Sequence, residues 1–87
     1  MGRKKMLKKL SEFFDMDARI REQRKEELAE LLSRLKEKEN ELKQALETES
    51  SPELRDQLVQ KIDIVHTQRK KGIQLSKDER STKNQGN

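Results

Sequence analysis

Two clusters of basic side chains are the groups in this sequence best suited to contact a ligand. A high local density of lysine and arginine attracts phosphate, either of nucleic acid or of anionic lipid. A helix C-terminus stabilised by bases, together with a solubilising terminal segment, explains the same residues without a ligand. Because the chain has no Trp or Tyr, we do not expect single-stranded nucleic acid to bind by base stacking. The candidate anion-contacting residues are Arg3, Lys4, Lys5, Lys8 and Lys9 in the first cluster and Arg69, Lys70 and Lys71 in the second.

The other reactive residue types form no catalytic or metal-binding pattern. His66 is the only histidine, the chain has no cysteine, and the carboxylates alternate with basic residues. The three glycines are isolated, so they form no phosphate-binding loop. We interpret His66 as a partly exposed helix residue whose acidic neighbour is Asp63, three residues before it. The sequence therefore predicts a protein that is not an enzyme, with no cofactor, no metal site and no small-molecule substrate.

A stripe of aliphatic residues is the main structural feature and the main candidate for a protein contact. Between residues 18 and 48, leucines recur every seven residues from Leu28 to Leu42, and others lie three or four residues after them. This heptad-like spacing predicts a helix with one apolar face, as in a coiled coil. A second stripe follows between residues 52 and 71. The candidate core and interaction residues are Leu28, Leu31, Leu32, Leu35, Leu42, Leu46, Leu54, Leu58, Ile62 and Val65.

The segment from Thr48 to Ser51 predicts a tight turn between the two helices. Ser51 can cap a new helix, and Pro52 suits the first helical position, where its missing N–H costs nothing. So short a connection makes the helices antiparallel. At the other end, three basic residues followed by Gly72 predict a left-handed C-cap. We therefore expect an antiparallel hairpin with helices over residues 18–48 and 52–71.

One polar step interrupts the stripe, at Lys38 and Glu39. Pairing the helices outward from the turn places Lys38 and Glu39 opposite Ile62. The aliphatic parts of the Lys38 and Glu39 side chains then cover Ile62. Glu39 also lies four residues before Lys43, in the order that favours an ion pair along a helix.

A basic amphipathic segment precedes the hairpin, and a polar segment follows it. Residues 1–17 predict a short helix and a hinge, with Met6, Leu7, Leu10, Phe13 and Phe14 on one face and Asp15 or Asp17 as the cap of the next helix. This short helix can cover the protruding end of the hairpin at 18–73 as a third helix, or it can lie in the interface of a membrane. A second copy of the chain is the alternative cover. Residues 74–87 predict a disordered polar tail.

Composition agrees with an all-α fold and a thin core. Of the 87 residues, 29% are hydrophobic and 44% are charged, which leaves little apolar surface to bury. The net charge of only +4 and the periodic apolar residues predict order in the middle of the chain. No stretch approaches the length of a membrane span, and the basic start is followed by no apolar run of a signal peptide. These features predict a cytoplasmic location.

A leucine stripe with too few layers to bury it predicts a protein–protein interaction module. The module either self-associates or docks an amphipathic helix of a partner. The alternative is a binder of polyanions, nucleic acid or an anionic membrane surface, through residues 3–9 and 69–71. In outline, a short chain folded as a helical hairpin resembles the small hairpin chaperones of type III secretion systems. That resemblance rests on size and shape, and it implies a protein partner.

Overall fold

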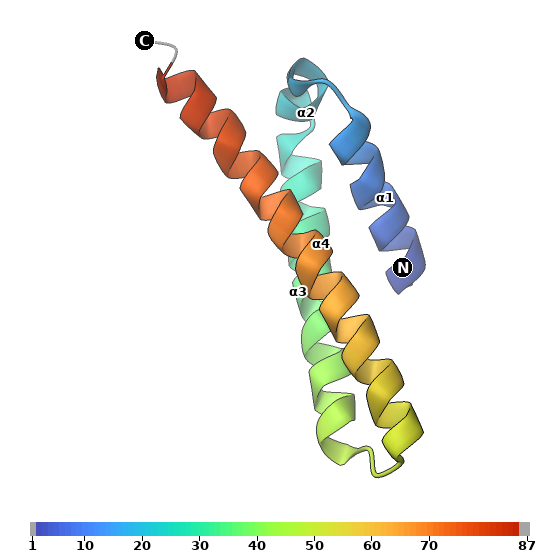
Figure 1. Cartoon of the computed structure of the whole chain (residues 1–87). Helices are drawn as coiled ribbons and strands as arrows, with labels where there is room; N and C mark the ends of the chain where they lie inside the picture. The colour runs from blue at the N-terminus through green and yellow to red at the C-terminus, as the bar shows by residue number, and fades with distance from the viewer. Residues whose placement is uncertain (1, 86–87) are drawn as a thin grey trace.

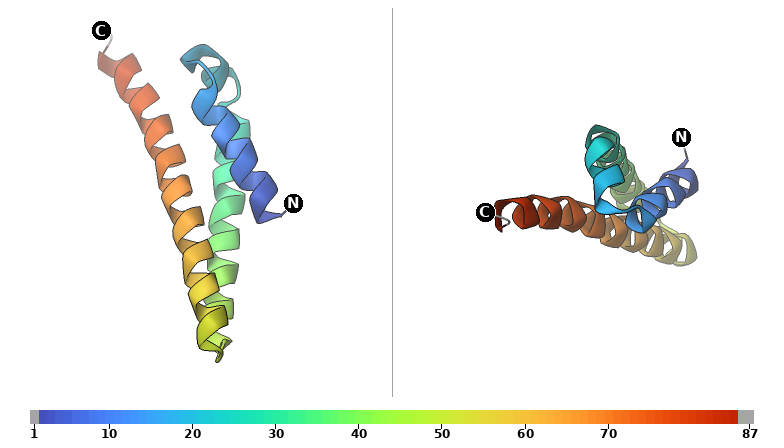
Figure 2. Two further views of the ribbon diagram at one scale, coloured as in Figure 1. Left: turned by 45° about the vertical axis from the view of Figure 1, so that its right-hand side comes forward. Right: turned by 90° about the horizontal axis from the view of Figure 1, so that it is seen from above.

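The computed structural model shows an all-α chain, which confirms the predicted fold class (Figure 1). The structure describes the backbone of residues 2–85 and the side chains of residues 2–77. This part of the chain forms helices α1 (Arg3–Asp15), α2 (Ala18–Gln23), α3 (Lys25–Thr48) and α4 (Pro52–Gln85). Helices α3 and α4 run antiparallel, and α1 lies beside the half of this hairpin that is away from the turn (Figures 1 and 2). Within the described range, no helix is both long and apolar enough to cross a bilayer.

The turn between α3 and α4 lies where the sequence predicted it. Pro52 is the first residue of α4. The Arg55 side chain closes the turn, because its Nη1 donates to the carbonyl oxygens of Leu46 at 2.8 Å and Glu49 at 2.9 Å. Leu46 lies in the last turn of α3 and Glu49 is its C-cap, where carbonyls lack the usual i+4 partner. The Leu46 carbonyl also accepts from the Glu49 N–H at 3.4 Å. Arg55 therefore caps α3 from the neighbouring helix.

The predicted single helix over residues 18–48 is wrong at Arg24, where α2 ends and α3 begins. Arg24 has φ −109° and ψ 22°, outside the helical region, and its N–H donates to the carbonyl oxygens of both Ile20 and Arg21. The short α2 is capped as expected, because the Asp17 carboxylate accepts from the Ile20 N–H at 3.1 Å. The physical reason for the break lies in the Arg24 side chain, whose tertiary contacts are described below.

The predicted helix end at Gly72 is also wrong, because α4 continues through it. Gly72 has no positive φ, so it is not a left-handed cap. Instead it is buried where the three long helices meet. A Cβ at this position would lie 2.6 Å from Leu32 Cδ2 of α3 and 3.2 Å from Leu10 Cδ1 of α1. The glycine therefore allows close approach of α1 and α3 to α4.

The polar segment that we predicted to be disordered from residue 74 is helical as far as Gln85. No Pro or Gly occurs between Gly72 and Gln85, and Gln, Lys, Glu and Arg, all good helix formers, recur along it. A helix that has passed Gly72 needs no new nucleus to continue. Residues 86–87 of the predicted tail lie outside the described residues.

The dry core lies in the half of the hairpin covered by α1. We call this the open half (residues 25–38 and 65–77), and the remainder, residues 39–48 and 52–64, the turn half. Every core residue is at most 4% exposed. The core consists of Met6, Leu10 and Phe13 of α1, Leu28, Leu31 and Leu35 of α3, and Val65 of α4. Helix α1 thus supplies the third layer that two helices alone lack.

Truncating one leucine in each half should show how much more the core of the open half contributes to stability than the partly buried stripe of the turn half. Leu35 is fully buried, whereas Leu58 is only half-buried. Leu35→Ala should lower the free energy of unfolding by about 2–4 kcal/mol, and Leu58→Ala by roughly half as much, because less surface and a shallower cavity are involved. Urea unfolding followed by circular dichroism measures both. Equal losses at the two positions would contradict this division of the hairpin.

Candidate interaction surfaces

The predicted aliphatic stripe divides into a buried part and an uncovered part. In the open half, Leu28, Leu31, Leu35 and Val65 are buried and Leu32 is half-buried. In the turn half, Leu42, Leu46, Leu58 and Ile62 are half-buried, and Leu54 is 47% exposed. The first group serves the core. Only the second group keeps apolar surface that a partner can reach.

The uncovered residues of the turn half form a groove between α3 and α4. Leu46, Val59 and Ile62 form its floor, and the groove has a volume of about 370 Å³. Val59 is 50% exposed. The rim of the groove is polar and is formed by Lys43, Asp63 and His66.

This groove faces away from α1. Leu75 lies beside Phe14 of α1. It follows His66 by nine residues, about two and a half helical turns, so the two side chains lie on opposite sides of α4. Helix α1 therefore cannot cover the groove that His66 borders.

A buried carboxylate, Glu39, marks the boundary between the two halves. Its side chain is 3% exposed and contacts two cations and a histidine. Lys43 Nζ lies 3.1 Å from its Oε2, while His66 Nδ1 and Arg69 Nε lie 3.2 and 3.4 Å from its Oε1. The aliphatic stems of Lys38 and Glu39 were predicted to cover Ile62. In the structure the Glu39 carboxylate instead contacts Lys43 of its own helix and His66 and Arg69 of α4. The pairing of His66 is thus with Glu39 of α3, rather than with Asp63 as we interpreted.

Opposing effects act on the pKa of Glu39. Burial raises this pKa, because it disfavours the charged form. Hydrogen bonds from Lys43 and His66, and then the nearby charge of Arg69, lower it and outweigh the burial. The net pKa lies below the ordinary value, so Glu39 is an ionised carboxylate inside the hairpin.

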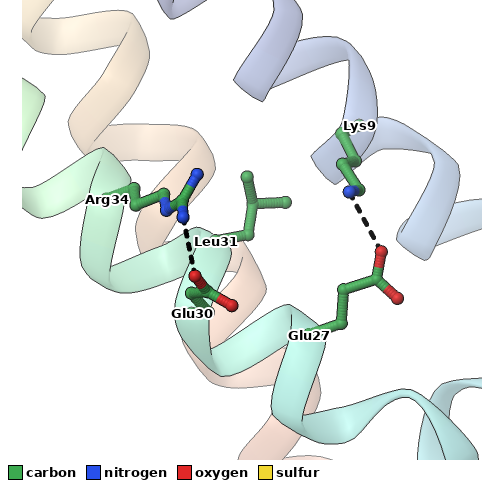
Figure 3. A pocket seen from close by; sticks show the side chains of 5 residues that line it. All are labelled: Lys9, Glu27, Glu30, Leu31 and Arg34. Carbon is green, nitrogen blue, oxygen red and sulfur yellow. Dashed lines mark hydrogen bonds and ion pairs between the residues drawn. The ribbon is translucent and has the colours of Figure 1, made fainter. Parts of the chain in front are cut away.

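A second charged cluster fixes the corner at which α1, α2 and α3 meet. Arg24 donates from Nε and Nη2 to the two carboxylate oxygens of Glu27, at 2.8 and 2.9 Å. Its guanidinium also lies over the ring of Phe13, 5.0 Å from the centroid. Lys9 of α1 reaches the same carboxylate, with Nζ 3.0 Å from Oε1 (Figure 3). Glu27 therefore ties α1 to the first turn of α3.

The groove between α1 and α3 is lined by charges of both signs. Figure 3 shows Lys9 and Glu27 on one side of Leu31, and Glu30 and Arg34 paired on the other. The Arg34 Nη2 lies 2.7 Å from Glu30 Oε1, four residues before it along α3. A surface in which each cation already faces a carboxylate has little net attraction for an anion.

The candidate anion-contacting residues do not form a single surface. Lys9 is paired with Glu27, and Arg69 with Glu39. Lys71 lies over the ring of Phe14, with Nζ 5.2 Å from the centroid. Arg3 is half-buried, whereas Lys4, Lys5, Lys8 and Lys70 are exposed. The two clusters therefore contain both structural cations and exposed ones.

Sequence reasoning missed the roles of Glu39 and Arg24. Glu39 lies four residues after Leu35 and three before Leu42, which places a carboxylate on the apolar stripe itself. His66 and Arg69, three residues apart on the facing helix, were the matching signal. No comparable local signal marks Arg24, because its partners come from α1, the α1–α2 connection and α3.

Comparisons with protein families, curated proteins and solved structures find no match. Within residues 2–77 no group of three or more His, Asp or Glu side chains is arranged to hold a metal ion.

The corner should weaken in acid through Glu27. Its hydrogen bonds from Arg24 and then Lys9 lower its pKa from 4.5 to about 2. A folded-state pKa below the unfolded one means that the stabilisation is present above about pH 5 and is lost as the pH falls through the folded value near 2. We expect Glu27→Gln to lower the melting temperature at pH 7 and to make little difference near pH 2. Thermal unfolding at both pH values tests this.

The matched control for that experiment is Glu26→Gln, which removes the neighbouring exposed carboxylate. It should leave the melting temperature close to that of the wild type. Equal changes in melting temperature for Glu26→Gln and Glu27→Gln would show that the contact between Lys9, Arg24 and Glu27 does not stabilise the corner.

Removing the charge of Glu39 should destabilise the hairpin. In Glu39→Gln, Arg69 and Lys43 lose their ionic acceptor, and we expect a loss of about 1–3 kcal/mol in the free energy of unfolding. Glu41→Gln is the control, since Glu41 faces only Lys38 at 3.0 Å on the surface and should cost no more than roughly 0.5 kcal/mol. Urea unfolding of both variants decides the matter. A Glu39→Gln protein as stable as Glu41→Gln would show that the buried carboxylate contributes nothing net.

Proposed function

We propose that this chain is a small cytoplasmic protein–protein interaction module without catalytic activity. Its turn half would bind a helix, either of a partner protein or of a second copy. The observation that carries the proposal is the uncovered groove of Leu46, Val59 and Ile62. Continuous apolar surface flanked by charged residues is typical of protein-binding sites.

The shape of the groove favours a helix as the ligand. Two antiparallel helices leave a channel between them, and amphipathic helices dock in such channels through residues spaced three or four apart. In the open half, α1 packs against the hairpin in this way, with Met6, Leu10 and Phe13 as its anchors. A partner helix would give the turn half the third layer that it lacks.

Less supports the alternative proposal, polyanion binding through residues 3–9 and 69–71. Lys9 and Arg69 each face a carboxylate already. The exposed lysines at positions 4, 5, 8 and 70 are the residues on which that alternative would depend.

Placing a carboxylate on the floor of the groove tests the proposal. Val59→Glu should abolish association, because an unpaired charge would be buried against the partner helix. Gln60→Glu is the matched control: it makes the same charge change at the adjacent exposed position. Sedimentation from low to high micromolar concentration, and stoichiometric capture from the native cell, measure association of the wild type and both variants.

The expected result is a complex formed by the wild type and by Gln60→Glu but not by Val59→Glu, with unchanged helix content in all three. A species of twice the 10.3 kDa chain mass would identify the partner as a second copy. A wild type that stays monomeric and captures no stoichiometric partner would refute the proposal, as would a complex that survives Val59→Glu.

A further inference from the structure

The side of the molecule on which α1 meets α4 carries a hollow with an exposed cation at its edge. Phe14 of α1 and Lys71 of α4 meet there, and with Gln74 and Leu75 they line an open hollow of about 340 Å³. Nothing in the proposed function uses this hollow, which lies on the opposite side of α4 from the Val59 groove. We refer to it, with its extension described next, as the α1–α4 face.

The face extends from the hollow towards the turn. Leu7 precedes Phe14 by seven residues, and Ile64 precedes Lys71 by seven, so each lies about two turns along the same side of its helix. Leu7 and Phe14 are half-buried against the core, whereas Ile64 is 47% exposed. The α1–α4 face therefore has an apolar floor that runs along both helices.

The rim of this face is mainly cationic. Its α1 side also carries the exposed Asp15, which lies eleven residues, or about three turns, after Lys4. Residues 2–11 contain five basic residues and no Asp or Glu, and residues 64–77 contain four basic residues and no Asp or Glu. On the α3 side of α1, by contrast, Lys9 is neutralised by Glu27. Among residues 2–77, no carboxylate within ion-pair distance faces Arg3, Lys4 or Lys71. These cations are left for a ligand to neutralise.

We propose that the α1–α4 face binds an acidic amphipathic helix of a partner protein. Its apolar residues would lie between α1 and α4, and its flanking carboxylates would face Arg3, Lys4 and Lys71. Charge complementarity sets the choice of ligand, since an apolar floor with a mainly cationic rim attracts an acidic amphipathic helix and repels a basic one. This surface is separate from the turn-half groove, so each proposal can fail without the other.

The apolar floor favours a protein helix over the other anionic ligands. Nucleic acid would present phosphates to Leu7 and Ile64, and Phe14 cannot stack on a base because Lys71 already lies over its ring. A bilayer favours apolar side chains that project outward beside Trp or Tyr. Here Leu7 and Phe14 pack back onto the core, and the chain has neither Trp nor Tyr.

A synthetic peptide supplies the test. The probe is an amphipathic helix of roughly 15 residues with leucines along one face and glutamates on its flanks. A control peptide carries lysines in place of the glutamates. Binding to the full chain is measured by fluorescence anisotropy, and the contact surface by NMR chemical-shift changes. We expect the glutamate peptide to bind and to shift Leu7, Phe14, Ile64 and Leu75, and the lysine peptide not to bind.

Charge reversals on the α1–α4 face and on α3 test whether the peptide binds at the α1–α4 face. Lys71→Glu and, on α1, Lys4→Glu should each weaken binding about tenfold, because attraction to the peptide becomes repulsion. Lys36→Glu makes the same charge change on the exposed surface of α3 and should have little effect. Helix content by circular dichroism verifies that all three variants fold.

Several outcomes would overturn the proposal. Equal weakening by Lys36→Glu and Lys71→Glu would leave only nonspecific charge attraction. Shifts confined to Leu46, Val59 and Ile62 would assign the peptide to the turn-half groove instead. Binding to phosphatidylserine vesicles without binding of the glutamate peptide would make the ligand a lipid surface, and no binding to either probe would leave the face without a ligand.

Discussion

The docking of α1 against the open half of the hairpin is the contact on which the rest of the structure depends. Two helices bury one stripe between them and leave its edges wet, and only a third layer excludes water from Leu31, Leu35 and Val65. Two other features of the open half, Gly72 and the helix break at Arg24, support that contact. Gly72 lets Leu10 and Leu32 approach α4 closely, and the break at Arg24 directs a guanidinium towards Phe13.

The length of α1 then determines where the apolar core stops. Its thirteen residues cover about 20 Å of a molecule whose longest dimension is 54 Å. Glu39 lies at the end of the covered length, where Lys43, His66 and Arg69 surround its buried carboxylate. A buried ionised group tolerates few alignments, so this network favours one register of α3 against α4. Beyond it, the stripe is only half-buried.

Local sequence signals predicted the elements that depend on local chemistry. Asp17 as a cap, Pro52 as a first helical residue and the pair Glu39–Lys43 each act through residues within four positions, and all three are found in the structure. The errors at Arg24 and Gly72 have the opposite origin. A glycine after three basic residues has the pattern of a helix end, and only the approach of Leu10 and Leu32 makes it a packing position inside a helix. That approach is set by tertiary contacts, which no local pattern contains.

The surface charges also depend on tertiary contacts that the sequence pattern does not contain, and here the difference bears on function. Read along the chain, residues 3–9 and 69–71 are two basic clusters of similar composition. In three dimensions each cluster is divided, because one side of α1 faces the carboxylates of α3 while its other side faces the acid-free stretch of α4. Lys9 and Arg69 thereby become structural cations, whereas Lys71 lies over Phe14 at the hollow between α1 and α4. Since a partner responds to the summed field of a surface rather than to its sequence, the packing of α1 decides which of these charges can select a ligand.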